Sequence, residues 1–363
     1  MFQPASRSIR WLLPAGTQST VYAGTYGGLF KSADRAATWE ATGLTGPIGI
    51  FTNIFAVAVD PTTLYAGSTE LYRSTDGGAR WTAGGRVPDT YILALAIDAS
   101  APATLYAVTG KVFKTTDSGA TWSDANTGLP GDHSLVALAI DPISPMTVYA
   151  ATAGNGLFKS TDAGNSWKAA NAGLATLSLT TLAIDPVNSG TLYAGSIAGL
   201  SKSTDGATSW ATLDQEPSPF GVFGLAIDPN DPRRVYAGTS EGVFFTTDGG
   251  ATWAALNSGL PPDAGVGPLA IDPITPTVLY GASGGSVFVI QQPDQLSGDC
   301  VGSCNRDPSV TVDEILTGVS IALGERPVSL CPVFDPDRDG TVDVGELLQG
   351  VANALSGCVL TIP

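Results

Sequence analysis

Short apolar segments separated by turn residues recur along most of the chain, at spacings too short for helices. One clear unit, LVALAIDPISPMTVYAATAGNGLFKSTDAGNSWKAANAGL, occupies residues 135–174. Its opening segment LAIDP returns at 182–186 and 225–229, and the following VYAAT returns as VYAGT at 235–239. Each unit therefore offers three β-rich segments and a fourth that begins at a Trp, with Gly, Pro, Asn and Asp between them.

This repeat predicts an all-β propeller. Four antiparallel strands in a unit of about 40–45 residues are the pattern of a propeller blade. A Tyr in the second segment recurs once per unit, which predicts seven blades: Tyr22, Tyr65, Tyr106, Tyr149, Tyr193, Tyr236 and Tyr280. The last unit stops at SVFVIQQ (286–292) without the Trp segment. We expect the first eight residues to supply the outer strand of blade seven and to remove an open edge.

An octapeptide, Ser/Thr-x-Asp-x-Gly-x-x-Trp, introduces the fourth segment. Its copies include STDGGARW (74–81), STDAGNSW (160–167) and TTDGGATW (246–253). An Asp in a tight turn accepts backbone N–H bonds, Gly permits positive φ, and Trp packs the turn against the sheet. We interpret the octapeptide aspartates as scaffold: Asp76, Asp117, Asp162, Asp205 and Asp248.

These residues resemble the Asp box of bacterial neuraminidase repeats, which is also found in sortilin-type receptors, xyloglucanases and photosystem II assembly factors. The resemblance covers roughly residues 10–290. It implies a seven-bladed β-propeller and is almost uninformative about function, because one fold hosts many functions.

An enzyme would use the face opposite the octapeptides. A sialidase holds its substrate carboxylate with three arginines, but the loops assigned to that face contain one, Arg86. Another glycosidase would need two carboxylates about 5–10 Å apart. The acids on this face are Glu70, Asp89, Asp132, Asp214, Glu216, Glu241 and Asp263. Sequence does not show whether two converge, and the single histidine, His133, is interpreted as a solvated loop residue.

Composition limits the partners. A net charge of −16 argues against nucleic acid, which needs clustered Lys and Arg. No apolar run reaches the ~18 residues of a membrane helix. The first residues, MFQPASRSIRWLLP, carry no signal-peptide core, so we expect any export signal to be missing from this sequence.

The pattern changes after residues 293–298, the expected linker. In the segment 334–357, FDPDRDGTVDVGELLQGVANALSG, every position of a calcium loop is matched. The ligands at positions 1, 3, 5, 7, 9 and 12 are Asp335, Asp337, Asp339, Thr341, Asp343 and Glu346. Short carboxylates, one carbonyl and a bidentate Glu are the oxygen donors that Ca²⁺ prefers, and Gly340 permits the sharp turn.

A degenerate copy precedes it. The equivalent positions are Ser303, Asn305, Asp307, Ser309, Thr311 and Glu314. Pro308 replaces the glycine and fixes φ near −65°. With only two carboxylates, this loop is either a weak calcium site or a structural remnant.

The two loop–helix units resemble a type I dockerin over residues 299–358. The resemblance implies folding on calcium and docking to a protein partner, cohesin-like or on the cell surface. Dockerin contact positions, Val312–Asp313 and Val344–Gly345 here, differ between the copies, so symmetric two-way docking is not expected.

All four cysteines lie in this module: Cys300, Cys304, Cys331 and Cys358. Without a CxxC pair or a nearby His, two disulfides are favoured over a zinc site. Three pairings are open, of which we favour Cys300–Cys358 with Cys304–Cys331. Disulfides imply an extracytoplasmic location.

The sequence therefore predicts a seven-bladed propeller at 1–292 and a small α-helical dockerin-like domain at 299–363. We interpret the protein as a secreted bacterial binding protein whose propeller displays a face for a protein or glycan. The alternative is a sialidase-like or other glycosidase that carries a dockerin. A photosystem-type assembly factor would not explain the cysteine-rich end.

Overall fold

The computed structural model describes residues 9–15, 20–25, 27–44, 54–59, 63–89, 91–131, 134–213, 221–257, 260–261, 264–272, 278–291, 312–324, 327, 331, 334, 341–343, 345, 347–348 and 351. The chain divides into two compact units, Met1–Ile290 and Gln291–Pro363. Among the described residues, no helix is both long and apolar enough to cross a membrane.

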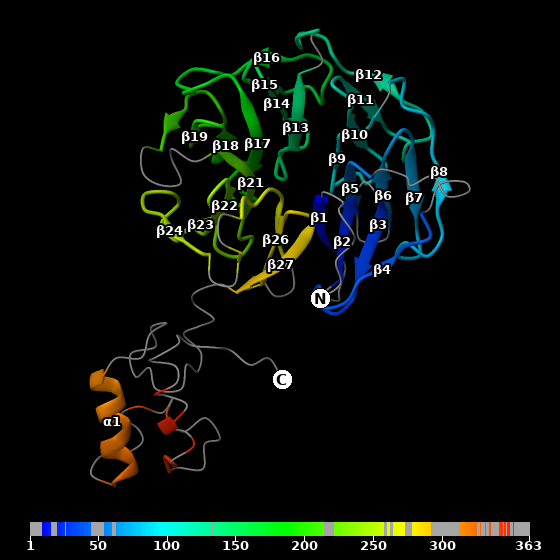
Figure 1. Cartoon of the computed structure of the whole chain (residues 1–363). Coiled ribbons are helices and arrows are strands. Elements are labelled where there is room, and N and C mark those ends of the chain that lie inside the picture. The colour runs from blue at the N-terminus through cyan, green and yellow to red at the C-terminus, as the bar shows by residue number, and fades with distance from the viewer. Residues whose placement is uncertain are drawn as a thin grey trace. The chain divides into compact units, whose positions relative to one another are not determined.

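The first unit is a ring of seven antiparallel sheets (Figure 1). In each sheet the strands pair in chain order from the inner strand outward. The first three blades are β1 (Ile9–Ala15), β2 (Thr20–Thr25), β3 (Gly28–Ser32) and β4 (Glu40–Ala41); β5 (Ala56–Val59), β6 (Leu64–Gly67), β7 (Leu71–Ser74) and β8 (Thr82–Ala83); β9 (Ala94–Ile97), β10 (Leu105–Val108), β11 (Val112–Thr115) and β12 (Ser123–Asp124).

The next three blades repeat this order. They are β13 (Leu135–Ile140), β14 (Val148–Thr152), β15 (Leu157–Ser160) and β16 (Lys168–Ala169); β17 (Leu179–Ile184), β18 (Leu192–Ser196), β19 (Gly199–Ser203) and β20 (Ala211–Thr212); β21 (Val222–Ile227), β22 (Val235–Thr239), β23 (Gly242–Thr246) and β24 (Ala254–Ala255). The described part of blade seven is β25 (Leu269–Ile271), β26 (Val278–Ser283) and β27 (Ser286–Gln291).

The prediction of a seven-bladed propeller is confirmed. The outer strands are two residues long and start just after the octapeptide Trp, so they are shorter than the other strands of each blade. Blade seven has three described strands, as the shortened last unit indicates. The outer strand that we expect from residues 1–8 lies outside the described residues.

The core lies between blades. Each of seven hydrophobic clusters combines side chains from two neighbouring blades, so the apolar faces of the sheets are buried against one another. The ring closes through the cluster in which Tyr280 and Ala282 of β26 pack with Val21 and Ala23 of β2. Packing of blade seven on blade one therefore joins the first and last repeats.

The repeated Tyr also joins neighbouring blades by hydrogen bonds. The Tyr193 hydroxyl donates to the carbonyl of Gly249 at 2.9 Å, and Nζ of Lys202 donates to the same oxygen at 2.6 Å. Lys202 Nζ lies 5.4 Å from the centroid of the Tyr193 ring, within the range of a cation–π contact. Tyr106 with Lys114 on Ala163, and Tyr149 with Lys159 on Gly206, repeat the arrangement.

In the second unit, α1 (Val312–Ala322) packs over a small core. Ile321, Cys331, Phe334 and Val342 form one buried cluster. Gly318 permits the close approach of the Phe334 ring, because a Cβ there would lie 2.5 Å from a ring carbon. These residues form one small cluster within the described part of the unit, and small domains have thin cores.

Candidate functional site

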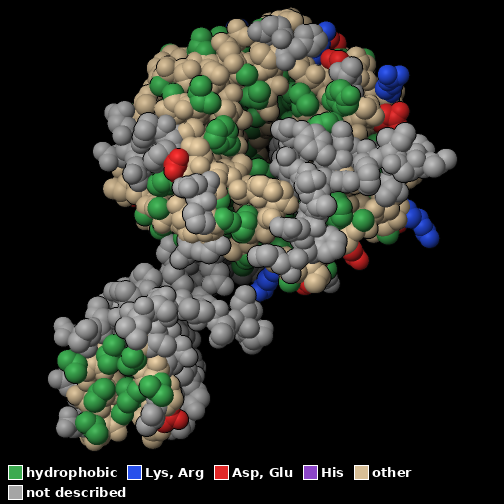
Figure 2. Space-filling model, viewed as in Figure 1, with side chains coloured by type: hydrophobic (Ala, Val, Ile, Leu, Met, Phe, Trp, Pro, Cys, Tyr) green, Lys and Arg blue, Asp and Glu red, His purple; other side chains and the backbone are tan. Residues whose placement is uncertain are grey.

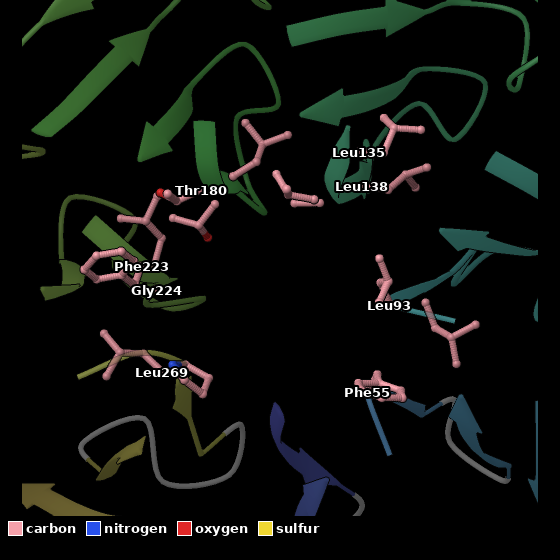
Figure 3. A pocket seen from close by; sticks show the side chains of 15 residues that line it. Phe55, Leu93, Leu135, Leu138, Thr180, Phe223, Gly224 and Leu269 are labelled. Atoms are coloured by element: carbon pink, nitrogen blue, oxygen red, sulfur yellow. The ribbon is translucent and has the colours of Figure 1, made fainter. Parts of the chain in front are cut away.

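A cavity of about 580 Å³ opens where the inner strands begin, on the propeller face opposite the octapeptide turns (Figure 3). Its lining residues come from six of the seven blades: Phe55, Leu93, Leu95, Leu135, Val136, Ala137, Leu138, Thr180, Thr181, Leu182, Phe223, Gly224, Leu225, Pro268 and Leu269. Among these residues the only polar side chains are the two threonines. The described side chains of this wall, which come from every blade except the first, are therefore mostly apolar.

Two positions of the repeat account for most of this lining. The Asp of LAIDP serves as the reference point. The fifth residue before it is Phe55, Leu93, Val136, Thr180 or Phe223. The third is Leu95, Leu138, Leu182, Leu225 or Leu269. Because these blades present the same end of their inner strands to the axis, one strand pattern, repeated, produces most of the described wall.

Four inner strands are irregular near their first residues. The register with the second strand skips Arg10 in β1, Val136 in β13, Thr180 in β17 and Phe223 in β21. Such a bulge places one extra residue outside the hydrogen-bonded ladder and redirects its side chain. Val136, Thr180 and Phe223 line the cavity, and the side chain of Arg10 lies outside the described part of the structure. The Thr180 hydroxyl donates to the carbonyl of Val222 in the next blade.

Large apolar side chains are exposed at this face. Leu93, Phe223 and Tyr91 are 40%, 45% and 47% exposed. The rings of Phe55 and Tyr91 meet edge to face, with centroids 5.4 Å apart. Figure 2 shows the central hollow of the propeller with hydrophobic side chains around it. A cluster of exposed apolar residues at a hollow is typical of a binding surface.

The acids predicted on this face do not line the cavity where they are described. Glu70 and Glu241 lie in turns between second and third strands, and Asp89 accepts a hydrogen bond from the Thr109 hydroxyl at 3.0 Å. None of the three belongs to the lining, and Arg86 is exposed and also outside it. Asp132, His133, Asp214, Glu216 and Asp263 lie outside the described residues. In the described part of the propeller, no pair of carboxylates faces the cavity.

The sequence interpretation missed the cavity because LAIDP was taken only as the first strand of a blade. A signal was present: Phe55, Leu93 and Phe223 are bulky apolar residues at a position where the strand joins a surface loop. Only the ring arrangement shows that these positions face a common space.

On the other face, each octapeptide Asp is held within its own turn. Oδ1 of Asp162 accepts the N–H of Ser166 at 2.8 Å and the hydroxyl of Ser160 at 2.7 Å, and Oδ2 accepts the Ser166 hydroxyl at 2.6 Å. The Ser166 hydroxyl, the Ser166 N–H and the Ser160 hydroxyl together lower the pKa of Asp162 to about 2. Similar bonds hold Asp34, Asp76, Asp117, Asp205 and Asp248.

The octapeptide turn also contributes to packing between blades, because one of its carbonyls accepts hydrogen bonds from the preceding blade. Ala163 adopts φ 56°, and Gly249 adopts φ 72°. These carbonyls are the ones that accept the Tyr and Lys bonds between blades. A left-handed residue at this position thus directs its carbonyl toward the neighbouring blade. The aspartates and their turns are committed to these bonds, which is the arrangement expected of scaffold.

Replacing Asp162 with Ala is expected to lower the melting temperature without changing the far-UV spectrum of the folded protein, because three hydrogen bonds in the turn are lost. A folded-state pKa of about 2 lies below the unfolded value of about 3.9, so the bonds contribute above pH 4 and are lost as pH falls toward 2. Calorimetry between pH 2 and pH 7 measures this, and the two proteins should converge at the acid end. Equal melting temperatures at pH 7 would contradict the prediction.

The described part of the C-terminal unit includes two of the predicted strong-loop ligands. Thr341 and Asp343 flank Val342, which is buried in the small core, and the Asp343 carbonyl accepts the Leu347 N–H at 3.1 Å. Asp335, Asp337, Asp339 and Glu346 lie outside the described residues. The same holds for five ligands of the degenerate loop: Ser303, Asn305, Asp307, Ser309 and Thr311. The sixth, Glu314, is described only as backbone of α1. No group of three or more His, Cys, Asp or Glu able to hold a metal occurs among the described residues.

Of the predicted disulfide cysteines, Cys331 is fully buried and is not a free thiol. Cys300, Cys304 and Cys358 lie outside the described residues, so the pairing stays a prediction.

Comparison with protein-family models and with curated proteins found no match. Many solved structures share the fold. A GH74 xyloglucanase from Xanthomonas campestris is 20% identical with TM-score 0.68, and the match covers 79% of this chain and 52% of the xyloglucanase. The chain thus spans about half of that enzyme's length.

Two further structures match the propeller to a similar extent. The extracellular domain of BT4673 from B. thetaiotaomicron is 13% identical with TM-score 0.65, over 80% of this chain and 39% of that one. YCF48 bound to D1 peptide is 17% identical with TM-score 0.63, over 80% of this chain and 96% of YCF48. At these identities the likeness establishes the seven-bladed propeller fold. Function has to be inferred from the residues of the site, because one fold hosts many functions.

Proposed function

We propose that the protein is a binding protein rather than an enzyme, and that its propeller captures a ligand in the central cavity. The observation that carries this is the lining, in which apolar side chains from six blades converge and no described carboxylate takes part. An apolar hollow with a few polar groups is the usual form of a binding site.

A glycosidase is the second candidate, because one neighbour in fold is a xyloglucanase. Its chemistry needs two carboxyl groups about 5–10 Å apart across a cleft, and hydrogen-bonding side chains for the sugar hydroxyls. Glu70, Asp89 and Glu241 stand outside the cavity lining. Another structural neighbour is YCF48 bound to D1 peptide, and this likeness in fold supports a polypeptide ligand over a sugar.

We further propose that residues 299–363 form a dockerin-like module that folds on Ca²⁺. The donor set of the loop at 335–346 fits the ion, since it offers five carboxylates and one backbone carbonyl. Burial of Val342 between Thr341 and Asp343 anchors this loop to the core beside α1. Disulfides among the four cysteines would add stability that so small a core lacks, and they support an extracytoplasmic location.

The module offers a surface for a protein partner. Leu316, Val319 and Leu323 are exposed and lie three and four residues apart, so they form one apolar stripe along α1 and the turn that follows it. Apolar helix faces of this kind dock onto grooves or sheets of other proteins. A cohesin-like or cell-surface partner fits this stripe, and the propeller would be displayed through it.

The enzyme alternative is tested by measuring reducing-sugar release from xyloglucan, carboxymethylcellulose and sialyllactose. We expect no release above the blank at micromolar protein, because no pair of described carboxylates faces the cavity. Glu70→Gln, Asp89→Asn and Glu241→Gln serve as matched variants. Release by the unmodified protein that one or two of these variants abolish would establish the hydrolase and overturn the binding proposal.

A further inference from the structure

One position of the repeat carries a positive charge in blade one and lines the cavity in five other blades. The register of β1 with β2 skips Arg10, and the registers of β13, β17 and β21 skip a residue at the same point of the repeat. In blades two to six the residues at this position all belong to the cavity lining: Phe55, Leu93, Val136, Thr180 and Phe223. The main-chain register of β1 therefore assigns Arg10 to the same ring of positions.

The following inference rests on the proposed binding function and names the ligand. We propose that the cavity binds an amphipathic carboxylate of the fatty-acid kind. Arg10 pairs with the carboxylate group, and the hydrocarbon body packs against the apolar side chains that the other blades contribute.

An arginine at this position needs an anionic partner. Its neighbours around the ring, Phe55 in blade two and Gly267 in blade seven, are uncharged, and so is every described residue of the lining. A guanidinium group stays protonated and loses hydration energy in apolar surroundings unless an anion binds it. Carboxylates suit it because two parallel N–H···O bonds form at once. One cation balances one carboxylate but not a phosphate ester, whose charge is about −2.

Gly267 leaves space beside this position. It is the fifth residue before Asp272, and blade seven packs against blade one. Apart from its chain neighbours, no described heavy atom lies within 4 Å of a Cβ placed on Gly267, whereas the same position holds phenylalanine in blades two and six. The ring of large side chains is therefore interrupted next to the position of Arg10, which leaves room for the head group.

The described wall suits a hydrocarbon body. Leu93 and Phe223 are 40% and 45% exposed, so an apolar ligand that covers them removes hydrocarbon surface from water. A buried polypeptide main chain needs a donor and an acceptor for each residue, whereas a hydrocarbon needs none. Of the two described hydroxyls, that of Thr180 already donates to the carbonyl of Val222. These features favour a fatty-acid-like body over a peptide, which is the competing ligand because of the likeness to YCF48.

Two pairs of variants separate the head group from the body. Arg10→Gln removes the charge, and Arg86→Gln is its control, because Arg86 is exposed on the same face and does not line the cavity. Phe223→Ser removes part of the apolar wall, and Val187→Ser is its control, because Val187 is 63% exposed in a turn on the octapeptide face. The melting temperature of each variant shows whether it is folded, and Arg10→Lys, which keeps the charge, should retain part of the binding.

The experiment uses the full chain and the probe dansylaminoundecanoate, whose fluorescence rises in an apolar site, beside its neutral primary amide. We expect the carboxylate to bind about 10–100-fold more tightly than the amide, which is the strength of hydrogen bonds to a charged group. Arg10→Gln should abolish this difference. Phe223→Ser should weaken the binding of both probes about tenfold, and both control variants should stay within about twofold. Unlabelled decanoate should displace the probe.

Three results would overturn this assignment. Equal binding of the two probes, or equal binding by the Arg10→Gln and Arg86→Gln proteins, would exclude the pairing with Arg10. Displacement of the probe by an apolar pentapeptide with a free carboxyl terminus, but not by decanoate, would identify a polypeptide as the ligand. In both cases the cavity still binds a ligand, so the binding function would stand. If neither probe bound, the fatty-acid assignment would fail, and the sugar-release assay would test the binding function separately.

Discussion

Calcium added to the full-length protein is expected to bind in one strong step and to stabilise the C-terminal unit. The loop at 335–346 has five carboxylates at ligand positions, whereas the loop at 303–314 has two at these positions and carries Pro308 where a sharp turn needs Gly. Because a preformed site rarely exists in an unfolded chain, binding free energy appears as folding free energy. At a hundredfold excess over Kd the stabilisation is about 2.7 kcal/mol. Calorimetric titration gives the number of steps, and calcium-dependent melting of the module gives the stabilisation.

A pair of isosteric variants makes this test specific. Glu346→Gln removes the bidentate position of the complete loop and should abolish the strong step. Glu314→Gln changes the equivalent position of the degenerate loop and should leave the step within about twofold, because that loop has few carboxylates. Two equal steps, or equal losses in both variants, would show that the loop at 303–314 is a full site.

Replacing Gly173 with Ala is expected to destabilise the propeller by about 3 kcal/mol or more, the sum of left-handed backbone strain and overpacking. Gly173 adopts φ 89°, and a Cβ there would lie 2.2 Å from the carbonyl oxygen of Trp210 in the next blade. The Trp210 N–H donates to the carbonyl of Ala172 at 2.8 Å, so the two backbones cannot separate without losing this bond. The loss corresponds to about 6–12 °C in Tm.

Gly154→Ala is the matched control, because no heavy atom lies within 4 Å of a Cβ at Gly154. It should change Tm by about 2 °C at most, which is the effect of an ordinary surface substitution. If the Gly173→Ala and Gly154→Ala proteins had equal melting temperatures, the close contact between Gly173 and Trp210 would not contribute to the stability of the propeller.

The two-residue outer strands illustrate what is local in this fold and what is not. Trp167 marks where β16 begins, and the preceding turn is fixed by bonds from Ser160 and Ser166 to Asp162, all within seven residues of one another. A pattern of this kind is readable from sequence because its energy comes from neighbours in the chain. The Tyr193–Lys202–Gly249 contact joins two repeats, and the sequence shows its members without showing that they meet.

The amino-acid sequence alone determined the blade repeat, the count of seven and the assignment of the octapeptides to tight turns, because strand alternation and turn chemistry act over a few residues. Tertiary structure decided the candidate site. Phe55, Leu93 and Phe223 are far apart in the chain and line one cavity because the blades form a ring. The ring closes through the packing of Tyr280 against Val21. Whether a strand end is buried core or the wall of an open cavity depends on the distance across the ring, which no local pattern encodes.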